Sequence, residues 1–195
     1  MKDFKRTLLS ITVCLLISVS CYAQVEKSKR LSSLYLQYNK TKSAQVERQF
    51  FKEFPDFFND FQAIYGYDDV KGASPNYKVA FEHVDLFFKA AVEVDSTQFI
   101  DKVVGICLNG KWNADAENYF QEHLRQYLFT HLKNVVKALS NKERSQVDSF
   151  WYFFFDGTLF NERIYQKTRK ILVDYPSMEK SLDKMARVVK MKVKE

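Results

Sequence analysis

Glycine and proline are scarce in this sequence, with five and three occurrences among 195 residues. So few turn-forming residues exclude collagen-like repeats, glycine-rich linkers and sandwiches built from many short strands. Three cysteines are too few for a disulfide framework. Hydrophobic residues make up 46% and charged residues 28% of the chain, which is the composition of a globular protein rather than a disordered one.

The motifs that identify many enzymes and metal sites are also absent. None of the histidines, His83, His123 and His131, has a glutamate three residues before it, which excludes the Glu-x-x-His pattern of di-iron bundles. The sequence has no His-Glu-x-x-His zinc motif, no glycine-rich phosphate loop and no Gly-x-Ser-x-Gly turn. We therefore predict no catalytic residue, no metal site and no cofactor, and we expect the histidines at the surface or its boundary.

Residues 153–159 resemble the first motif of phosphatases of the haloacid-dehalogenase type. In that family the motif is Asp-x-Asp-Gly-Thr-Leu after an apolar run, and its first aspartate is the nucleophile. Only residues 156–159 match, and Phe154 stands where the nucleophile belongs. A phenyl ring cannot replace a carboxylate nucleophile, so we interpret Asp156 and Gly157 as the end of a helix.

The first 23 residues have the pattern of a secretory signal peptide. Lys2, Lys5 and Arg6 precede an apolar stretch over residues 8–19, and the small residue Ala23 follows shortly after it. The apolar stretch is too short to span a bilayer of roughly 30 Å as a helix. We predict a signal peptide at 1–23, export to the periplasm or the medium, and no membrane span.

A second interpretation of the same region concerns Cys21. This cysteine ends a degenerate bacterial lipoprotein box, in which Ser18 replaces the usual branched aliphatic residue. A lipid anchor on Cys21 is therefore an alternative to soluble export. Because of the departure at Ser18, we favour cleavage after Ala23, which leaves Gln24 as the first residue.

After residue 23 the hydrophobic residues recur at steps of three and four, which is typical of amphipathic helices. We expect one long helix over residues 117–139. Residues 24–195 are predicted to be a single all-α domain, a compact irregular bundle of about eight helices. Further helices are expected near residues 31–38, 43–54, 55–66, 75–92, 95–110, 140–157, 159–173 and 177–193.

The spacing also predicts which side chains form the core. In residues 75–92 we expect Tyr77, Phe81, Val84, Phe88 and Val92 on the buried face. Cys107 has Val104, Val103 and Ile100 as helical neighbours, and these do not supply the cationic, partly exposed setting that a catalytic thiol needs. We therefore expect Cys107 to be an inert core residue.

Charge is distributed unevenly along the chain. Residues 53–101 carry ten acidic and three basic residues, a net charge of −7, whereas residues 24–52 and residues 161–195 each carry +5. Such segregation can steer charged partners, unless the packing of the helices cancels the fields. In the acidic segment the candidate partner-binding residues are Asp60, Tyr65, Tyr67, Asp68 and Asp69, because both tyrosines adjoin a predicted helix end, where side chains tend to be accessible.

These observations favour an exported, non-enzymatic protein that binds another protein, and one version is a periplasmic immunity or inhibitor protein that occludes its partner. The abundance of aromatic residues, 18 Phe and 11 Tyr, makes a helical carrier of an apolar small ligand the alternative. An enzyme without a linear motif is the third reading. Nucleic-acid binding is not expected, because the basic residues are dispersed through helices of an exported chain.

Overall fold

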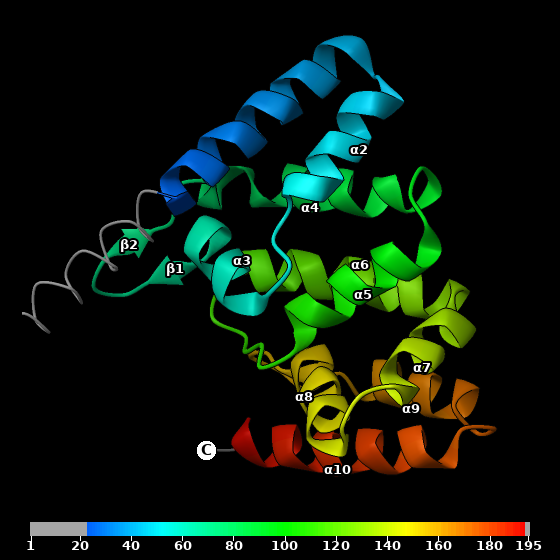
Figure 1. Cartoon of the computed structure of the whole chain (residues 1–195). Helices are drawn as coiled ribbons and strands as arrows, with labels where there is room; N and C mark the ends of the chain where they lie inside the picture. The colour runs from blue at the N-terminus through cyan, green and yellow to red at the C-terminus, as the bar shows by residue number, and fades with distance from the viewer. Residues whose placement is uncertain (1–22, 194–195) are drawn as a thin grey trace, which may run out of the picture.

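Helices account for most of residues 23–193, the part of the chain that the computed structural model describes (Figure 1). This confirms the all-α prediction, although the described chain has ten α-helices rather than about eight. Within the described part, no helix combines the length and the hydropathy needed to cross a bilayer. The apolar stretch of the predicted signal peptide and Cys21 lie outside the described residues.

Short connections join the elements, which follow one another in chain order. The first described helix covers residues 23–41. After it come α2 (Ala44–Glu53), α3 (Phe58–Tyr65), β1 (Tyr67–Asp68), β2 (Gly72–Ala73), the 3₁₀ turn η1 (Tyr77–Val79), α4 (Ala80–Lys89), the 3₁₀ turn η2 (Ala90–Val92), α5 (Ser96–Cys107), α6 (Asp115–Thr130), α7 (Leu132–Ser140), α8 (Arg144–Phe155), α9 (Glu162–Ile171) and α10 (Pro176–Lys192).

The helices are stacked in tiers. Helix 23–41 and α2 form one end, α3 to α6 form the middle, and α8, α9 and α10 form the other end (Figure 1). The closest helix pairs are α8 with α10, α4 with α6, and α5 with α7. The buried hydrophobic side chains form one cluster that runs through all tiers.

Aromatic rings join the tiers at the centre of the molecule. The ring centroids of Phe54 and Phe87 are 4.2 Å apart and nearly parallel, and Phe87 stacks in turn on Phe99 at 5.2 Å. Phe120 of the middle tier lies 6.2 Å from Phe153 of the last. Such ring pairs add specific geometry to the burial of apolar area. Most of the phenylalanine content is thereby used in solid packing rather than in lining a cavity.

The long helix expected over residues 117–139 is two helices in the structure. The backbone leaves helical geometry at His131, with φ −126° and ψ 33°, and α7 starts at the next residue. The hydroxyl of Thr130 donates to the carbonyl oxygens of Gln126 and Tyr127 at 3.2 and 3.1 Å, and such bonds within a helix favour bending. The sequence prediction missed the break because Leu128, Leu132 and Val135 keep helical spacing across it.

The buried face of α4 also differs from the prediction. Phe81 is 52% exposed and Val92 is 87% exposed, so placing them in the core was wrong. Helix α4 instead turns His83 and Phe87 inward. Val92 lies in η2, beyond the end of α4, where the periodicity of the α-helix no longer applies. The expectation of a surface or boundary histidine is wrong for His83, which is fully buried.

Two connections lie outside the helices that we expected to contain them. Pro55 precedes α3, which begins only at Phe58, instead of lying in its first turn. Helix α5 ends at Cys107, three residues before Gly110. Cys107 itself is a free, fully buried cysteine, as expected, and burial raises the pKa of its thiol well above the usual range.

Candidate binding surface

A short β-hairpin carries most of the candidate residues. Strands β1 and β2 pair Tyr67 with Ala73 and Asp68 with Gly72. The carboxylate of Asp68 accepts hydrogen bonds from the backbone N–H of Val70 at 2.9 Å and of Lys71 at 2.7 Å. These donors lower the pKa of Asp68, because they favour its charged form. The hairpin is therefore held in shape by one of the acidic residues that the sequence analysis assigned to a partner.

The candidate residues do not all reach the surface. Tyr67, Asp68 and Asp69 are exposed together in the hairpin. Tyr65 is fully buried, so the expectation that it is accessible was wrong. Its hydroxyl lies 3.1 Å from Nδ1 of the buried His83, and burial raises the pKa of Tyr65 well above its usual range. Tyr65 packs at the end of α3 because that helix turns its last residue toward α4.

Asp60 lies apart from the hairpin. It is in the first turn of α3, and an eight-residue helix is about 12 Å long. A carboxylate at that position is favoured by the partial positive charge of the helix N-terminus. The structure thus groups Tyr67, Asp68 and Asp69, and it separates them from Asp60 and from the buried Tyr65.

The exposed Tyr67 begins a row of rings that the sequence analysis did not identify. The ring of Tyr67 is 5.7 Å from that of Tyr77, and the ring of Phe81 is 5.3 Å from that of Tyr119. Phe81 also lies 6.5 Å from His123. We call these five residues, Tyr67, Tyr77, Phe81, Tyr119 and His123, the aromatic strip. The strip consists of two groups of rings, Tyr67 with Tyr77 at the hairpin and η1, and Phe81 with Tyr119 and His123 across α4 and α6.

Polar contacts hold the strip in place. The hydroxyl of Tyr77 donates to the carboxylate of Asp115 at 3.0 Å, and this bond raises the pKa of Tyr77. Asn113 donates from its side-chain amide to the carbonyl oxygen of Tyr67. The start of α6 is therefore tied to the hairpin and to η1, so the rings from three elements keep fixed relative positions.

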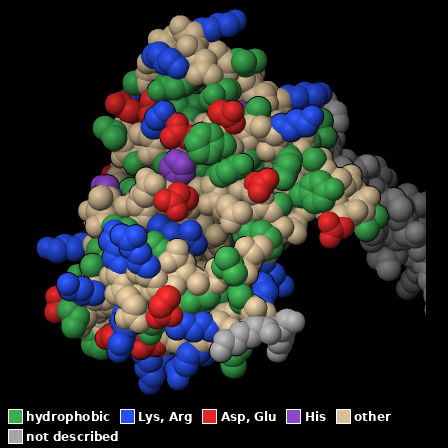
Figure 2. Space-filling model, turned by 180° about the vertical axis from the view of Figure 1, so that it is seen from behind, with side chains coloured by type: hydrophobic (Ala, Val, Ile, Leu, Met, Phe, Trp, Pro, Cys, Tyr) green, Lys and Arg blue, Asp and Glu red, His purple; other side chains and the backbone are tan. Residues whose placement is uncertain are grey.

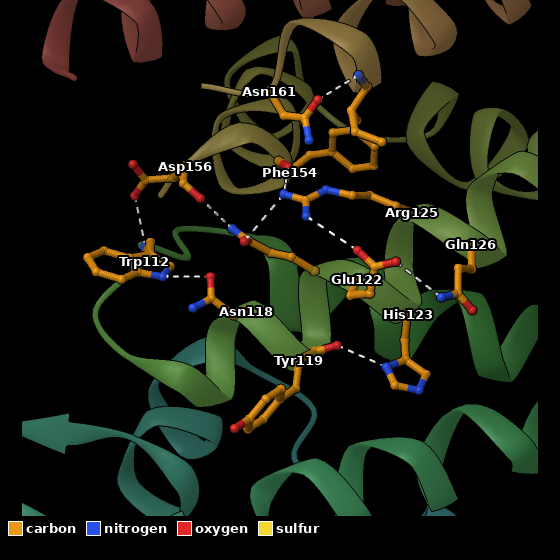
Figure 3. A network of polar contacts seen from close by, with 12 residues as sticks. Trp112, Asn118, Tyr119, Glu122, His123, Arg125, Gln126, Phe154, Asp156 and Asn161 are labelled. Carbon is orange, nitrogen blue, oxygen red and sulfur yellow. Dashed lines mark hydrogen bonds and ion pairs between the residues drawn. The ribbon is translucent and has the colours of Figure 1, made fainter. Parts of the chain in front are cut away.

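His123 closes the strip at its far end. Its Nδ1 lies 2.9 Å from the carbonyl oxygen of Tyr119, one turn earlier on α6 (Figure 3). Its Nε2 lies 3.4 Å from the carboxylate of Asp85 on α4. The imidazole also stacks on Phe88, with centroids 5.3 Å apart. Three contacts on three sides fix the ring between α4 and α6.

Acidic side chains surround the strip and continue the charge pattern of the sequence. Asp68 and Asp69 lie at the hairpin, Asp115 at the start of α6, and the exposed Glu82 and Glu122 on α4 and α6. Figure 2 shows a face on which hydrophobic side chains gather, with charged side chains scattered among them. The combination of exposed rings and carboxylates is suited to cationic groups, which are attracted by both.

The sequence contains a pattern that indicates this strip, namely aromatic residues spaced four apart on two segments. Tyr77 and Phe81 are four residues apart, as are Tyr119 and His123. Residues at that spacing share one face of a helix. From spacing alone we place Phe81 in the core, and we expect His123 at the surface or its boundary without relating it to the other rings. Aromatic residues on a second face of each helix, outside the predicted core face, would have indicated the exposed strip.

Asp156, from the segment that resembles a phosphatase motif, is buried. Its carboxylate accepts a hydrogen bond from the backbone N–H of Trp112 at 2.8 Å (Figure 3). It also pairs with Lys192 of α10 at 2.7 Å. The side chain of Gln121 donates to the carbonyl oxygens of Phe153 and Asp156, the latter at 2.8 Å. These contacts close the end of α8, as the sequence analysis expected of a helix stop, and they join α6, α8 and α10.

The described residues 23–193 form no metal-binding cluster, and the hollows found among them are small or open to solvent. No group of three or more His, Cys, Asp or Glu side chains in this part of the chain is placed to hold a metal ion. The most enclosed hollow found lies between α5 and α7 and has a volume of about 160 Å³, and wider hollows of up to about 750 Å³ are open to solvent. Pockets for small-molecule ligands usually have volumes of at least about 300 Å³.

Comparison with known proteins adds no relative. No protein-family model matches the chain, and no match was found among curated proteins or among solved structures.

Proposed function

We propose that this protein is an exported, non-enzymatic binding protein that occludes a protein partner, as an immunity or inhibitor protein does. The observation that carries the proposal is the aromatic strip. Tyrosine and other aromatic residues are enriched at the centres of protein interfaces, where they supply rigid contact area. The export part of the proposal rests on the signal-peptide pattern of residues 1–23.

The exposure of Phe81 supports an interface rather than a structural role for the strip. Its side chain is 52% exposed and lies in the middle of the strip, between Tyr119 and His123. The neighbouring groups are partly exposed rings, carboxylates and the exposed lysines Lys71 and Lys78, so the region is an apolar centre with a charged rim. This arrangement is typical of a surface that excludes water when a partner binds.

The charge around the strip indicates the partner. Residues 53–101, which include the hairpin and α4, carry a net charge of −7. A basic protein surface would be attracted at long range by this charge and would bury the rings on contact. The carrier hypothesis is less favoured, since the aromatic residues are packed against one another and the most enclosed hollow found has a volume of about 160 Å³.

Site-specific photocrosslinking in the native host tests the proposal. A photoreactive phenylalanine analogue is placed at Phe81, and as the matched control at Val173, which is 67% exposed and lies after α9 in the last tier. We expect a discrete covalent product from position 81 and none from position 173. The absence of any product at 81, or the same products at both positions, would refute the proposed surface.

The captured partner then allows the strip to be tested by binding kinetics. Phe81→Ala should speed dissociation, at a cost of about 1–2 kcal/mol if the ring is buried on binding. Asp69→Lys should slow association and weaken its salt dependence, because rim charges act on the encounter. Asp68→Asn is the better neutral variant at its position, since asparagine can still accept the two backbone N–H groups of the hairpin.

A further inference from the structure

Helices α4 and α6 lie side by side in parallel. Phe81 contacts Tyr119 near the starts of the helices, and Phe88 contacts Tyr127 near their ends, with ring centroids 6.4 Å apart. Residue numbers therefore increase in the same direction along both helices, which means that the helices run parallel. As a consequence, the C-terminal turns of α4 and of α6 lie next to each other at the far end of the aromatic strip.

An open hollow of about 360 Å³ lies between these two C-terminal turns. The ring of Phe88 and the largely buried ring of Tyr127 give it apolar walls, and the carboxylate of Asp85 lies at its edge. His123, the last residue of the strip, forms the side toward Phe81. The remaining lining residues are Lys89, Gln126 and Thr130.

The electrostatics of the hollow favour a positive charge. The C-terminal end of an α-helix carries a partial negative charge of about half an electron. Helix α6 ends beside this space, whereas α4 continues there into η2. The carboxylate of Asp85 adds a full negative charge. Glu122 on α6 lies one residue before His123 and is exposed. The basic groups that line the hollow are Lys89 and His123.

Lys89 forms an ion pair with Asp85, the carboxylate at the edge of the hollow. Its ammonium lies 2.7 Å from Oδ2 of Asp85, and its side chain is 58% exposed. This hydrogen bond raises the pKa of Lys89. An exposed ion pair between residues four apart on a helix contributes little to stability. A cation from another molecule can therefore displace Lys89 from Asp85 at little cost.

We propose that the hollow between the C-terminal turns of α4 and α6 binds one arginine side chain of the protein partner, with Asp85 as its counter-ion and Lys89 as the internal cation that it displaces. This inference rests on the proposed function and names the chemistry that the partner presents next to the strip. Arginine fits better than lysine because its planar guanidinium stacks on aromatic rings and pairs with a carboxylate through two parallel hydrogen bonds. A partner arginine would pair with Asp85 and contact Phe88 at the wall of the hollow, since Phe88 already stacks on His123 and Tyr127 on His131.

Titration of the purified protein with short peptides tests this inference without the natural partner. The probes are tetra-arginine, tetra-lysine and, as the uncharged control of the same shape, tetra-citrulline, with NMR signals of His123, Phe88 and Tyr127 as the readout. We expect saturable shifts at these residues with tetra-arginine, weaker ones with tetra-lysine and none with tetra-citrulline. Shifts spread evenly over the acidic residues of the protein, or equal shifts with tetra-citrulline, would overturn the inference.

Two variants change the affinity in opposite directions. Asp85→Asn should weaken tetra-arginine binding about tenfold, since it removes a charged hydrogen bond. Lys89→Met should strengthen binding about threefold, since it removes the competing cation. A structural role for Asp85 would not produce tighter binding in Lys89→Met, so unchanged or weaker binding by that variant counts against the inference.

The outcomes separate this inference from the proposed function. If position 81 crosslinks to a partner but tetra-arginine does not bind at the hollow, the arginine assignment is wrong and the binding surface stands. If tetra-arginine binds at the hollow but position 81 yields no product, the hollow takes guanidinium groups and the proposed protein interface is wrong.

Discussion

Burial of His83 should make the stability of this protein depend on pH in the mildly acidic range. The imidazole is fully buried among the rings of Tyr35, Phe50 and Tyr65, with centroids 4.9, 5.2 and 5.7 Å away. Burial lowers the pKa of His83 from 6.5 to about 4. The nearest polar atom to Nδ1 is the Tyr65 hydroxyl, and Nε2 has no hydrogen-bond partner among the described residues.

The sign of the effect follows from which state binds the proton. Below pH 6.5 the unfolded chain protonates this histidine, while the folded protein keeps it neutral until about pH 4. The unfolded state therefore binds more protons in this window, and the free energy of unfolding falls as the pH falls. Between pH 7.5 and pH 4.5 the loss due to His83 is about 2.5 kcal/mol.

Urea unfolding at pH 7.5 and pH 4.5, followed by circular dichroism, measures this loss. Other groups titrate too, such as Glu47 and Glu117, whose pKa values are raised by burial, so the comparison is with the variant His83→Gln. The wild type should lose about 2.5 kcal/mol more than the variant on acidification.

The variant Tyr65→Phe is a matched control for the cause of the effect. It removes the hydroxyl next to Nδ1 of His83 but leaves the imidazole buried. Because burial and not this hydrogen bond lowers the pKa, Tyr65→Phe should keep the pH dependence of the wild type. Equal losses in wild type and His83→Gln would refute the reasoning.

Three other predictions follow from the buried groups and the N-terminus. Asp156→Asn should lower the free energy of unfolding by about 1–3 kcal/mol. Lys192→Met should lower it by about 3 kcal/mol or more, because it leaves a buried carboxylate without its cation. A larger loss for Asp156→Asn than for Lys192→Met in urea unfolding would contradict this order. The thiol of Cys107 should react with thiol reagents only after unfolding, and rapid labelling of the native protein would show that it is accessible. Mass spectrometry of protein from the native host should find Gln24 at the N-terminus, whereas an acyl mass on Cys21 would indicate a lipid anchor.

The helical fold could be predicted because the hydrophobic residues keep a period of three and four along nearly the whole chain. What that period does not encode is the break at His131, since a helix can end between two residues that both point to the core. The hairpin was missed for another reason. Its strands are two residues long, and no alternation of hydrophobic and polar residues can develop over so short a length.

The candidate site was predicted only in part. Tyr67, Asp68 and Asp69 are exposed where an acidic loop was expected, but the position of Tyr65 depends on the direction in which α3 enters the core. Phe81 shows the opposite error. A phenylalanine at helical spacing is usually buried, and only the packing of α4 against α6 decides that Phe81 remains outside. Burial of a particular side chain is a tertiary property, which one helix cannot specify.

The parallel arrangement of α4 and α6 determines how far through the fold a bound partner would stabilise the protein. The chain must pass through α5 before α6 can lie beside α4, so the strip and the hollow exist only when residues from the hairpin to the end of α6 are folded together. Aromatic stacking of Phe87 on Phe54 and Phe99 couples the same segment to the first tier. A partner present at one hundred times its dissociation constant would stabilise this entire unit by about 2.7 kcal/mol. Amide hydrogen exchange should therefore slow throughout the aromatic core, far from the surface that the partner covers.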